Sequence, residues 1–518
     1  MPTPTRSLTP ARAALLAACA LYLAPASAQA QGWQGYGKDA QHSSANNFPS
    51  QAPNRIRWHT PVDMNPQYAN GGADLYIHYG SPAITRENTV LLPVKTGQND
   101  GFSLRAFRGY DGAALWSLET DYSVPPHGWT PPCGPTLTAR DRAVVVPAAG
   151  GTVLSRSQPN RANGAAVTRM AFYGIDNYNA APSTYDPTVK ICTPITADGL
   201  GNLYFGFVAA AGAPLSLASG LARIGVDGTG SYVSAATAAN DPGIKKVAYN
   251  CAPALSLDGG TVYVAVNDQS GSGSAHGYLL ALNSTTLATR SKVRLKDFKI
   301  PANDAIITDD STASPTVGPD GDVYFGVLEN PFYSNNLRGW MLHYSGDLST
   351  AKPAGAFGWD DTASVVPASI VASYAGTSRY LILTKYNNYV EGNGDGVNKL
   401  AVLDPNATQT DPVSGVAGVM KEVLTIAGIT PDTNFLAQHP NAVREWCINS
   451  AAIDKSGKCA IVNSEDGHLY RWDFTTNTLT GGLPLNGPVG EAYTPTVIGP
   501  DGAVYAINNA TLYSCVAK

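Results

Sequence analysis

One phrase recurs eight times along the chain, and it limits the possible folds more than any other feature. Each copy has a small residue, usually a proline, a short apolar run, a tight turn and a strand that carries tyrosine. The clearest copies span residues 314–326 and 494–505. The proline positions are 82, 135, 194, 253, 315, 367, 449 and 495, and Asn449 replaces proline in the seventh copy. A repeat of this kind indicates one supersecondary unit used many times.

Each copy predicts a β-hairpin, because Asp-Gly between apolar runs favours the turn between antiparallel strands. The composition agrees: 52 Gly and 37 Pro suit many short strands, while 44% hydrophobic and 14% charged residues exclude disorder and coiled coils. We predict an all-β fold, an eight-bladed β-propeller with four-stranded antiparallel blades. The alternatives are a β-sandwich or a β-solenoid, but a sandwich rarely repeats one hairpin phrase eight times.

The last repeat is incomplete, because only residues 504–507 and 511–516 remain to form its outer strands. An N-terminal strand would complete this blade and leave no open sheet edge. We expect residues 33–41 to supply that strand. Deletion of residues 31–50 is therefore expected to destabilise the ring.

The first thirty residues are expected to be a signal peptide. Arg6 and Arg12 precede an apolar stretch over residues 13–24, and small-residue cleavage sites lie at 26–28 and 28–30. A lipid-attachment box ending at Cys19 is the alternative, but the apolar run before it is short. No later stretch approaches the roughly 20 apolar residues of a membrane span. We expect a periplasmic or secreted protein with one propeller domain over residues 31–518.

The charge of the chain argues against two classes of partner. Without residues 1–30, which carry two Arg and no acid, the net charge is −7. Nucleic acids and anionic membrane surfaces are bound by clustered Lys and Arg, which this chain lacks.

Two segments resemble the PQQ-like (quinoprotein alcohol dehydrogenase-like) β-propeller superfamily. Residues 104–116, which end in Trp116, resemble its tryptophan-docking motif, and residues 33–42 resemble its entry strand. The superfamily contains quinone-dependent dehydrogenases and non-enzymatic envelope scaffolds. The adjacent Cys-Cys pair on which its alcohol dehydrogenases stack their quinone is absent here, so PQQ is less expected.

Standard motifs for haem attachment, zinc hydrolysis, serine nucleophiles and phosphate binding are absent from the sequence. Residues 391–396 resemble the start of a calcium loop, but Val402 stands where the bidentate Glu is expected. A glycine-rich turn explains these residues equally well. The cofactor therefore stays unassigned, with calcium as one candidate.

Four cysteines, Cys133, Cys192, Cys251 and Cys447, each lie two residues before a proline position of the repeat. If that position begins the innermost strand, as in the resembled superfamily, they ring one mouth of the central channel. Three interpretations are open: packing of small apolar side chains, a disulfide between neighbouring blades, or a thiolate site.

Residues just before the innermost strands are the candidates for a site, because such loops meet at the channel mouth. They include polar and aromatic side chains that could bind a small polar molecule or an oligosaccharide. The proposed ligand-binding residues are His78, Tyr79, His127, Trp129, Lys190, Asn250, Trp446 and Tyr493. The proposed catalytic residues are Arg444, Glu445, Glu491 and Asp310. Ordinary solvated loops are the alternative interpretation.

Arg444 and Glu445 follow the longest interval between two repeats, and insertions in repeat proteins often map to the binding face. Three functions stay open. The first is an exported propeller that binds a polar ligand in its funnel, with or without turnover. The second is a PQQ- and calcium-dependent oxidoreductase, and the third is a scaffold that binds protein partners.

Overall fold

The computed structural model describes Met1 and residues 32–269, 275–487 and 495–518. The chain divides into two units, residues 1–30 and 31–518, and the second contains every strand and helix described below. The expected signal peptide, Cys19, Glu491 and Tyr493 lie outside the described residues.

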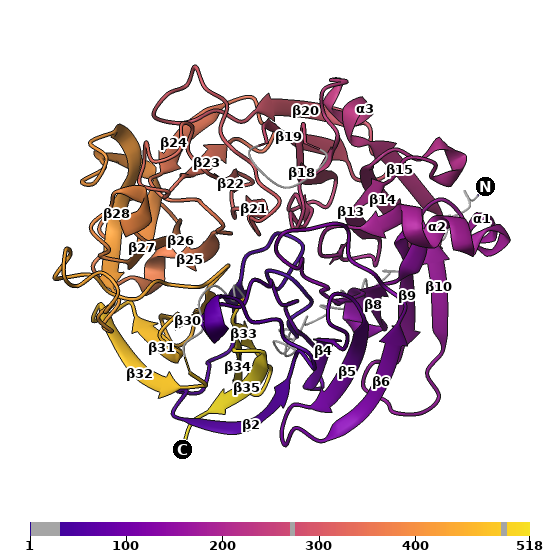
Figure 1. The fold of residues 1–518 in the computed structure, drawn as a ribbon, viewed down its shortest axis with the longest axis horizontal. Coiled ribbons are helices and arrows are strands. Elements are labelled where there is room, and N and C mark those ends of the chain that lie inside the picture. The colour runs from indigo at the N-terminus through magenta and orange to yellow at the C-terminus, as the bar shows by residue number, and fades with distance from the viewer. Residues whose placement is uncertain (2–31, 270–274, 488–494) are drawn as a thin grey trace. The chain divides into compact units, whose positions relative to one another are not determined.

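The second unit is an eight-bladed β-propeller, which confirms the predicted fold class. Figure 1 shows the eight sheets arranged around a central axis. The strands of each blade are given from the inside outward. Blade one contains β3 (Ala83–Ile84), β4 (Thr89–Lys95), β5 (Phe102–Arg108) and β6 (Ala114–Thr120), and blade two contains β7 (Thr136–Leu137), β8 (Ala143–Pro147), β9 (Thr152–Ser157) and β10 (Val167–Ala171). Blade three contains β12 (Thr196–Ala197), β13 (Leu203–Ala209), β14 (Gly220–Ile224) and β15 (Gly230–Ser234), and blade four contains β17 (Ala254–Leu255), β18 (Thr261–Asn267), β19 (Gly277–Asn283) and β20 (Thr289–Arg294).

Blades five to eight continue around the ring. Blade five contains β21 (Thr316–Val317), β22 (Val323–Val327), β23 (Trp340–Tyr344) and β24 (Ala351–Gly355), and blade six contains β25 (Ser364–Pro367), β26 (Tyr380–Tyr386), β27 (Lys399–Thr410) and β28 (Ala417–Ala427). Blade seven contains β29 (Ala452–Asp454), β30 (Cys459–Asn463), β31 (His468–Asp473) and β32 (Thr478–Pro484). Blade eight contains β33 (Val497–Ile498), β34 (Val504–Asn508), β35 (Thr511–Val516) and β2 (Arg55–Pro61). Three further strands add to blades three, four and seven: β11 (Val189–Ile191), β16 (Lys246–Val247) and β1 (Ala45–Asn46).

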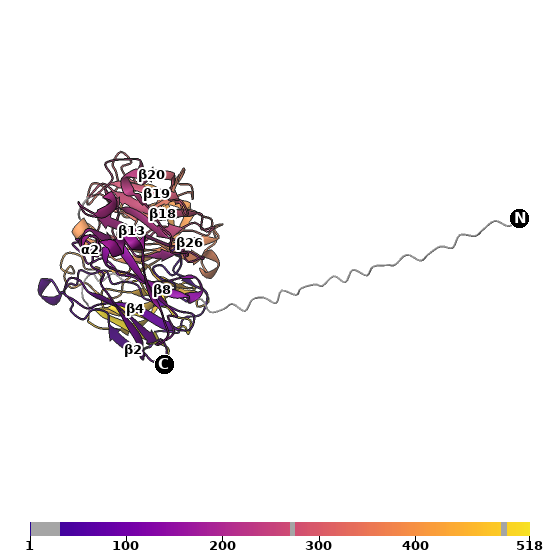
Figure 2. The same ribbon diagram turned by 90° about the vertical axis from the view of Figure 1, so that its right-hand side faces the viewer.

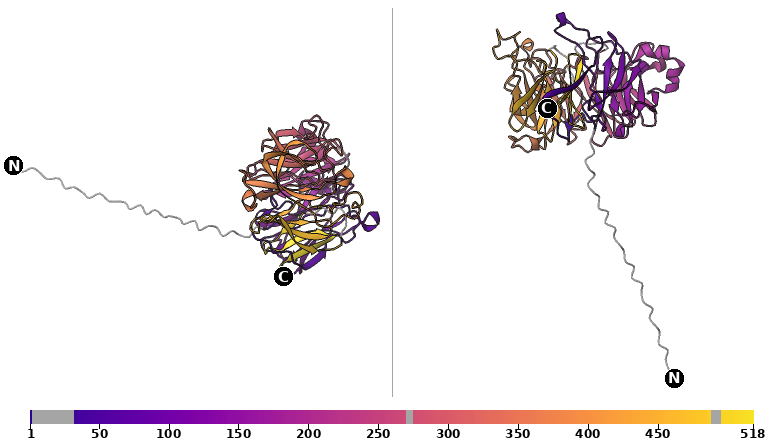
Figure 3. Two further views of the ribbon diagram at one scale, coloured as in Figure 1. Left: turned by 90° about the vertical axis from the view of Figure 1, so that its left-hand side faces the viewer. Right: turned by 90° about the horizontal axis from the view of Figure 1, so that it is seen from below.

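Short helical segments lie in the connections between strands. The α-helices are α1 (Ile175–Ala180), α2 (Pro182–Thr188) and α3 (Ala235–Ala239). The 3-10 turns are η1 (Asn70–Gly72), η2 (Ala139–Asp141), η3 (Ala149–Gly151), η4 (Pro214–Ser216), η5 (Ala368–Ile370) and η6 (Val390–Gly392). Figures 2 and 3 view the ring from its sides and show the loop that carries η1 projecting from one face.

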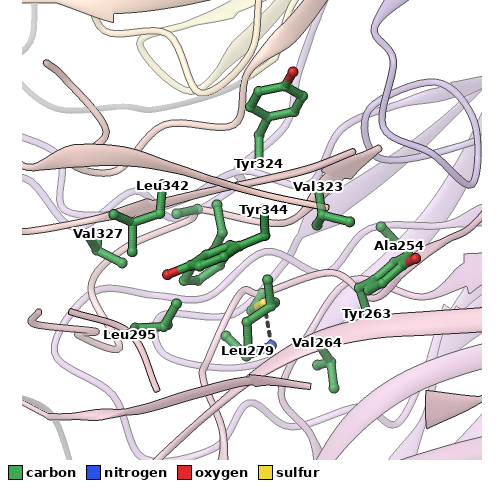
Figure 4. Packing of buried hydrophobic residues seen from close by; sticks show 14 of the residues in the cluster. Ala254, Tyr263, Val264, Leu279, Leu295, Val323, Tyr324, Val327, Leu342 and Tyr344 are labelled. Atoms are coloured by element: carbon green, nitrogen blue, oxygen red, sulfur yellow. Dashed lines mark hydrogen bonds between the residues drawn. The ribbon is translucent and has the colours of Figure 1, made fainter. Parts of the chain in front are cut away.

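The blades pack face to face through apolar side chains of their two middle strands. Tyr324, Phe325 and Val327 of β22 are all buried. Figure 4 shows the side chains of β22 and β23 lying against those of β18 and β19 in the preceding blade. Tyr324 also places its hydroxyl 2.6 Å from the hydroxyl of Tyr380 in the following blade. Because these strands are buried on both faces, they form nearly continuous apolar runs, and each blade depends on both neighbours.

The strand that closes the ring is β2, not residues 33–41 as expected. It pairs antiparallel with β35 and forms the outer edge of blade eight. Trp58 of β2 then crosses to blade one, where its indole N–H donates to the carbonyl of Gly109 at 2.8 Å. A Cβ on Gly112, whose φ is 73°, would lie 2.7 Å from the Trp58 ring. Glycine is therefore required both for this turn and for the docked tryptophan.

Trp116 repeats the same docking one blade later. Its indole N–H donates to the carbonyl of Pro159 at 2.8 Å, and the Arg156 guanidinium lies 3.7 Å from its ring centre. Blades one and two are thus joined as the resembled tryptophan-docking motif predicts.

Residues 33–46, which we call the plug, occupy the centre of the ring instead. They form the indigo trace in the middle of Figure 1. The plug bonds to the innermost part of seven blades, because the edge of each innermost strand would otherwise be unpaired. Its hydrogen bonds, in blade order, are Trp33–Ile84, Gln34–Leu137, Gln34–Ala197, Ala40–Leu255, Gln41–Val317, Ser43–Val365 and Ser44–Ile453.

The plug also corrects the repeat register in blades six and seven. The strand residues whose amides bond the plug are equivalent, and they include Val317, Val365 and Ile453. Counting from them, the position of Pro315 corresponds to Ala363 and Ala451, not to Pro367 and Asn449. Pro367 instead ends its innermost strand.

Candidate functional site

The loops that lead into the innermost strands form one face of the propeller, which we call the entry face. The hairpin turns and the plug lie at the other end of these strands, which we call the turn face. Most predicted site residues lie at the entry face.

Buried ion pairs occupy the walls of the entry face. Lys95 of β4 lies 3.2 Å from Asp63, and Lys246 of β16 lies 2.6 Å from Asp309. In both pairs each side chain is almost completely buried. A third lysine, Lys385 of β26, lies 3.9 Å from Asp360. Removal of one partner from a buried ion pair strongly destabilises a fold, because the remaining charge is buried without its partner. These pairs therefore hold the entry-face loops against the blades.

Tyr79 and Asn250 belong to this buried layer. The Tyr79 hydroxyl donates to Asp63 at 3.0 Å, and burial raises the pKa of that hydroxyl. The Asn250 amide nitrogen donates to the carbonyls of Asp309 and Ser311 at 3.1 and 3.3 Å. Both predicted ligand-binding residues are therefore held inside the wall.

An aromatic stack leads from this layer to the surface. His78 is buried and stacks on Trp129, with ring centres 4.9 Å apart and planes inclined by 22°. Trp129, which is half-buried, also contacts Tyr76 at 4.9 Å, and Tyr76 is 36% exposed. The bridge between Ile77 and Thr130 aligns the two segments that supply these rings.

A carboxyl group from the opposite side of the ring meets this stack. Asp310, which precedes blade five, accepts a hydrogen bond from the Trp129 amide and is half-buried. Burial raises the pKa of Asp310, and the neighbouring charges of Asp309 and Asp360 raise it further. Its oxygens lie where they can also accept hydrogen bonds from the hydroxyl groups of a ligand.

Arg444 and Glu445 lie on the rim of the same face, in blade seven. The Arg444 Nε lies 3.7 Å from Asp432, and the Glu445 amide donates to Glu465 at 3.3 Å. Burial raises the pKa of Glu465, Arg444 lowers it, and the charges of Asp432 and Asp74 raise it. Asp74 also accepts a hydrogen bond from the Tyr76 hydroxyl at 3.1 Å. The charge of Asp74, the partner of Tyr76, therefore acts on Glu465 of blade seven.

The other predicted ligand-binding residues have separate settings. Trp446 is fully buried in the core against Tyr470. Lys190 donates to Ser123 and to the Val124 carbonyl, and His127 contacts the carbonyl of Pro125.

Tyr76, Asp74 and Glu465 were not among the predicted residues. Tyr76 lies two positions before His78, and side chains two positions apart in an extended segment point to the same side. This spacing could have identified Tyr76 as a site residue. Glu465 lies in the loop between β30 and β31, and no signal in the sequence joins it to Asp74.

The four cysteines do not all share one position of the repeat. Cys133 and Cys251 lie four residues before Leu137 and Leu255, but Cys447 lies six before Ile453, where Asn449 takes the equivalent place. Burial raises the pKa of Cys133 and Cys192, and it raises that of Cys251 to about 12. Within the described residues no disulfide joins the cysteines. These are the surroundings of packed thiols, because a reactive cysteine needs an open, electropositive setting.

The calcium-like segment forms a hydrogen-bonded turn. Asp395 accepts from the Asn388 amide at 2.6 Å and from the Val397 N–H at 2.9 Å. Among the residues that the structure describes, no group of three or more His, Cys, Asp or Glu side chains is arranged to hold a metal ion.

The channel residues do not fit the quinone that the superfamily implies. The cavity on the axis, bounded by Tyr36, His78, Thr312 and Asn449 among others, has a volume of about 10 Å³. That is room for about one water molecule, whereas a small-molecule site needs about 300 Å³ or more. Residues of the plug and of the entry-face loops line this small cavity.

No protein-family model and no curated protein matches the sequence. Among solved structures, a europium-containing methanol dehydrogenase matches with a TM-score of 0.52 and 10% identity, covering 92% of this chain and 89% of its own. A quinohemoprotein alcohol dehydrogenase from Comamonas testosteroni gives 0.49 and 12%, covering 94% and 81%. BamB from Moraxella catarrhalis gives 0.42 and 12%, covering 89% and 98%. Together with the eight four-stranded blades, the similarity to the methanol dehydrogenase structure shows that this chain has a β-propeller fold.

Proposed function

We propose that this protein is an exported propeller that binds a neutral, sugar-like ligand at its entry face. The observation that carries the proposal is the stack of His78, Trp129 and Tyr76 beside Asp310. Aromatic rings offer a flat surface for the C–H face of a sugar ring. The carboxyls of Asp74 and Asp310 supply the few polar groups that orient such a ligand.

The site is built to stay in place before a ligand arrives. Its innermost ring is buried, its backbone is fixed by the Trp129–Asp310 hydrogen bond, and its outer ring is held by Asp74. A preorganised site loses little conformational entropy on binding. Asp310 comes from blade five and Trp129 from the connection between blades one and two, so the ring must close before the site forms.

Calorimetric titration with neutral gluco- and chito-oligosaccharides tests this function. Wild-type protein should bind at least one of them, and Tyr76→Ala and Trp129→Ala should each weaken binding by about tenfold or more. Tyr110→Ala is the matched control, because Tyr110 is an exposed tyrosine on the β5–β6 turn. No binding by the wild type, or equal binding by all three variants, would refute the proposal.

Export is tested separately by fractionation and N-terminal sequencing of the mature chain. The proposal expects cleavage after residue 28 or 30 and recovery outside the cytoplasm. Among the described residues no helix is long and apolar enough to cross a bilayer.

A further inference from the structure

A second cavity lies at the turn face, between the plug and blades one to three. Its volume is about 410 Å³, which is in the range of small-molecule sites. The charged residues that line it are Lys38, Asp39, Arg86, Arg140 and Asp141. It shares none of these residues with the entry-face site.

The two carboxylates of this cavity already accept hydrogen bonds from the protein. Asp39 accepts from the amide and the hydroxyl of Ser43. Asp141 accepts from the Arg86 amide at 2.8 Å, and the Arg86 Nε lies 3.4 Å away. Lys38 lies 3.7 Å from Asp39 and the Arg86 Nε lies 3.4 Å from Asp141, so each acid is matched by one cation. The guanidinium of Arg140 gives the cavity an excess of one positive charge, which favours an anion.

The cations come from different parts of the chain. Lys38 belongs to the plug and is largely buried, with Asp39 at 3.7 Å. Arg86 lies in the turn after β3, and Arg140 is an exposed residue of η2. Two guanidinium groups and one ammonium on three segments can surround an oxyanion, and arginine can bind one through two parallel N–H groups.

The backbone holds these side chains in a conformation that costs energy. Lys38, Arg140 and Asp141 have φ values of 78°, 59° and 54°. At the place equivalent to Asp141, the turn of blade four has Gly259, whose φ is 69°. Glycine adopts such a φ at little cost, whereas residues with a Cβ store strain that concentrates at functional sites. Blade two retains an Arg-Asp pair where glycine would be less strained.

We infer that this cavity is a binding site for a small organic oxyanion, a metabolite that carries a carboxylate or a phosphate. Arg140 and Arg86 contact the oxyanion, and Lys38 neutralises it from the plug. Because the plug forms one wall, the site exists only when residues 33–46 are seated in the ring.

Calorimetric titration of the intact protein in low-salt buffer tests this site with citrate, glucose 6-phosphate and inorganic phosphate. We expect citrate or glucose 6-phosphate to bind, and the one that binds identifies the source of the oxyanion. Arg140→Gln should weaken that binding at least tenfold, while Arg142→Gln, a change at an exposed arginine outside the cavity, should leave it within about twofold. Trp129→Ala should not change it.

Three results would overturn the inference: no binding of either organic anion by the wild type, equal weakening by Arg140→Gln and Arg142→Gln, or binding of inorganic phosphate alone. Arg140 is exposed, so its variant is expected to fold. Thermal denaturation without ligand checks this, and Lys38→Met provides a second variant from a different segment.

Discussion

The Tyr36 hydroxyl donates a hydrogen bond to the Asn449 side-chain oxygen at 2.5 Å, although 413 residues separate them. The same hydroxyl lies 2.8 Å from the Thr362 hydroxyl and 3.0 Å from the Thr312 carbonyl. One side chain of the plug thus connects blades five, six and seven on the axis. This relationship explains why the N-terminal segment fills the centre of the propeller and why the cavity that the described residues enclose there is only about 10 Å³.

Tyr36→Phe should lower the free energy of unfolding by about 1–3 kcal/mol, because it leaves buried polar groups without their shared partner. Urea denaturation measures the change. Tyr110→Phe, at an exposed position, should change stability by less than about 0.5 kcal/mol. Equal effects would mean that the axial hydrogen bonds contribute little.

Gly112→Ala should destabilise the junction between the first and last blades. Alanine at this position would have to adopt an unfavourable positive φ, and its Cβ would lie 2.7 Å from the Trp58 ring. Gly228→Ala is the matched control, because Gly228 has a φ of 82° and a Cβ added there would meet no atom within 4 Å. The control isolates the cost of φ, so we expect Gly112→Ala to cost about 1–3 kcal/mol more. A smaller loss than in the control would contradict the docking of Trp58.

Stability should fall as the pH is lowered from about 6.5 towards 4. Burial lowers the pKa of both His42 and His78 to about 4, while an unfolded histidine titrates near 6.5. The unfolded state therefore takes up protons first, and each neutral ring contributes stability that is complete above about pH 6.5. About 3 kcal/mol per histidine is lost on the way to pH 4.

Denaturation of the His42→Gln/His78→Gln variant at pH 7.5, 6 and 5 measures this dependence. The charge of Asp39 raises the pKa of His42 and that of Asp360 raises the pKa of His78, while Lys385 lowers the pKa of His78. Burial raises the pKa of Asp361, and a carboxyl with a raised pKa makes the stability increase, not decrease, as the pH falls. The comparison is therefore between variants. The double variant should show a flatter pH profile, and His59→Gln, at an exposed position, should keep the wild-type slope.

Arg444→Ala and Glu445→Gln should each abolish ligand binding at the entry face while leaving the fold intact. Arg444 lies on the rim, where its charge lowers the pKa of Glu465 and opposes the effect of the Asp74 carboxyl on the same group. Oligosaccharide titration combined with thermal denaturation separates the two effects. Full binding by either variant would confine the site to the aromatic stack, and loss of folding would assign both residues a structural role.

The blades were predictable because each hairpin is specified locally by its turn and its apolar strands. The register failed in blades six and seven, where Ala363 and Ala451 occupy the place of Pro315. It also slipped by one residue in blades three and eight, where the strand pairing puts Ile195 and Thr496 in that place. The destination of residues 33–46 was not predictable, because their partners lie on seven blades spread along the chain. The same holds for the approach of Asp310 to Trp129, which depends on closure of the whole ring.

Sugar-like ligands should bind on the ring stack of Trp129 and Tyr76 at the entry face. Saturation-transfer difference NMR with the oligosaccharide that binds in calorimetry tests it most directly. We expect saturation of the sugar C–H protons in the wild type and in Arg140→Gln, and its loss in Trp129→Ala. Undiminished transfer in Trp129→Ala, or loss of transfer in Arg140→Gln instead, would contradict it.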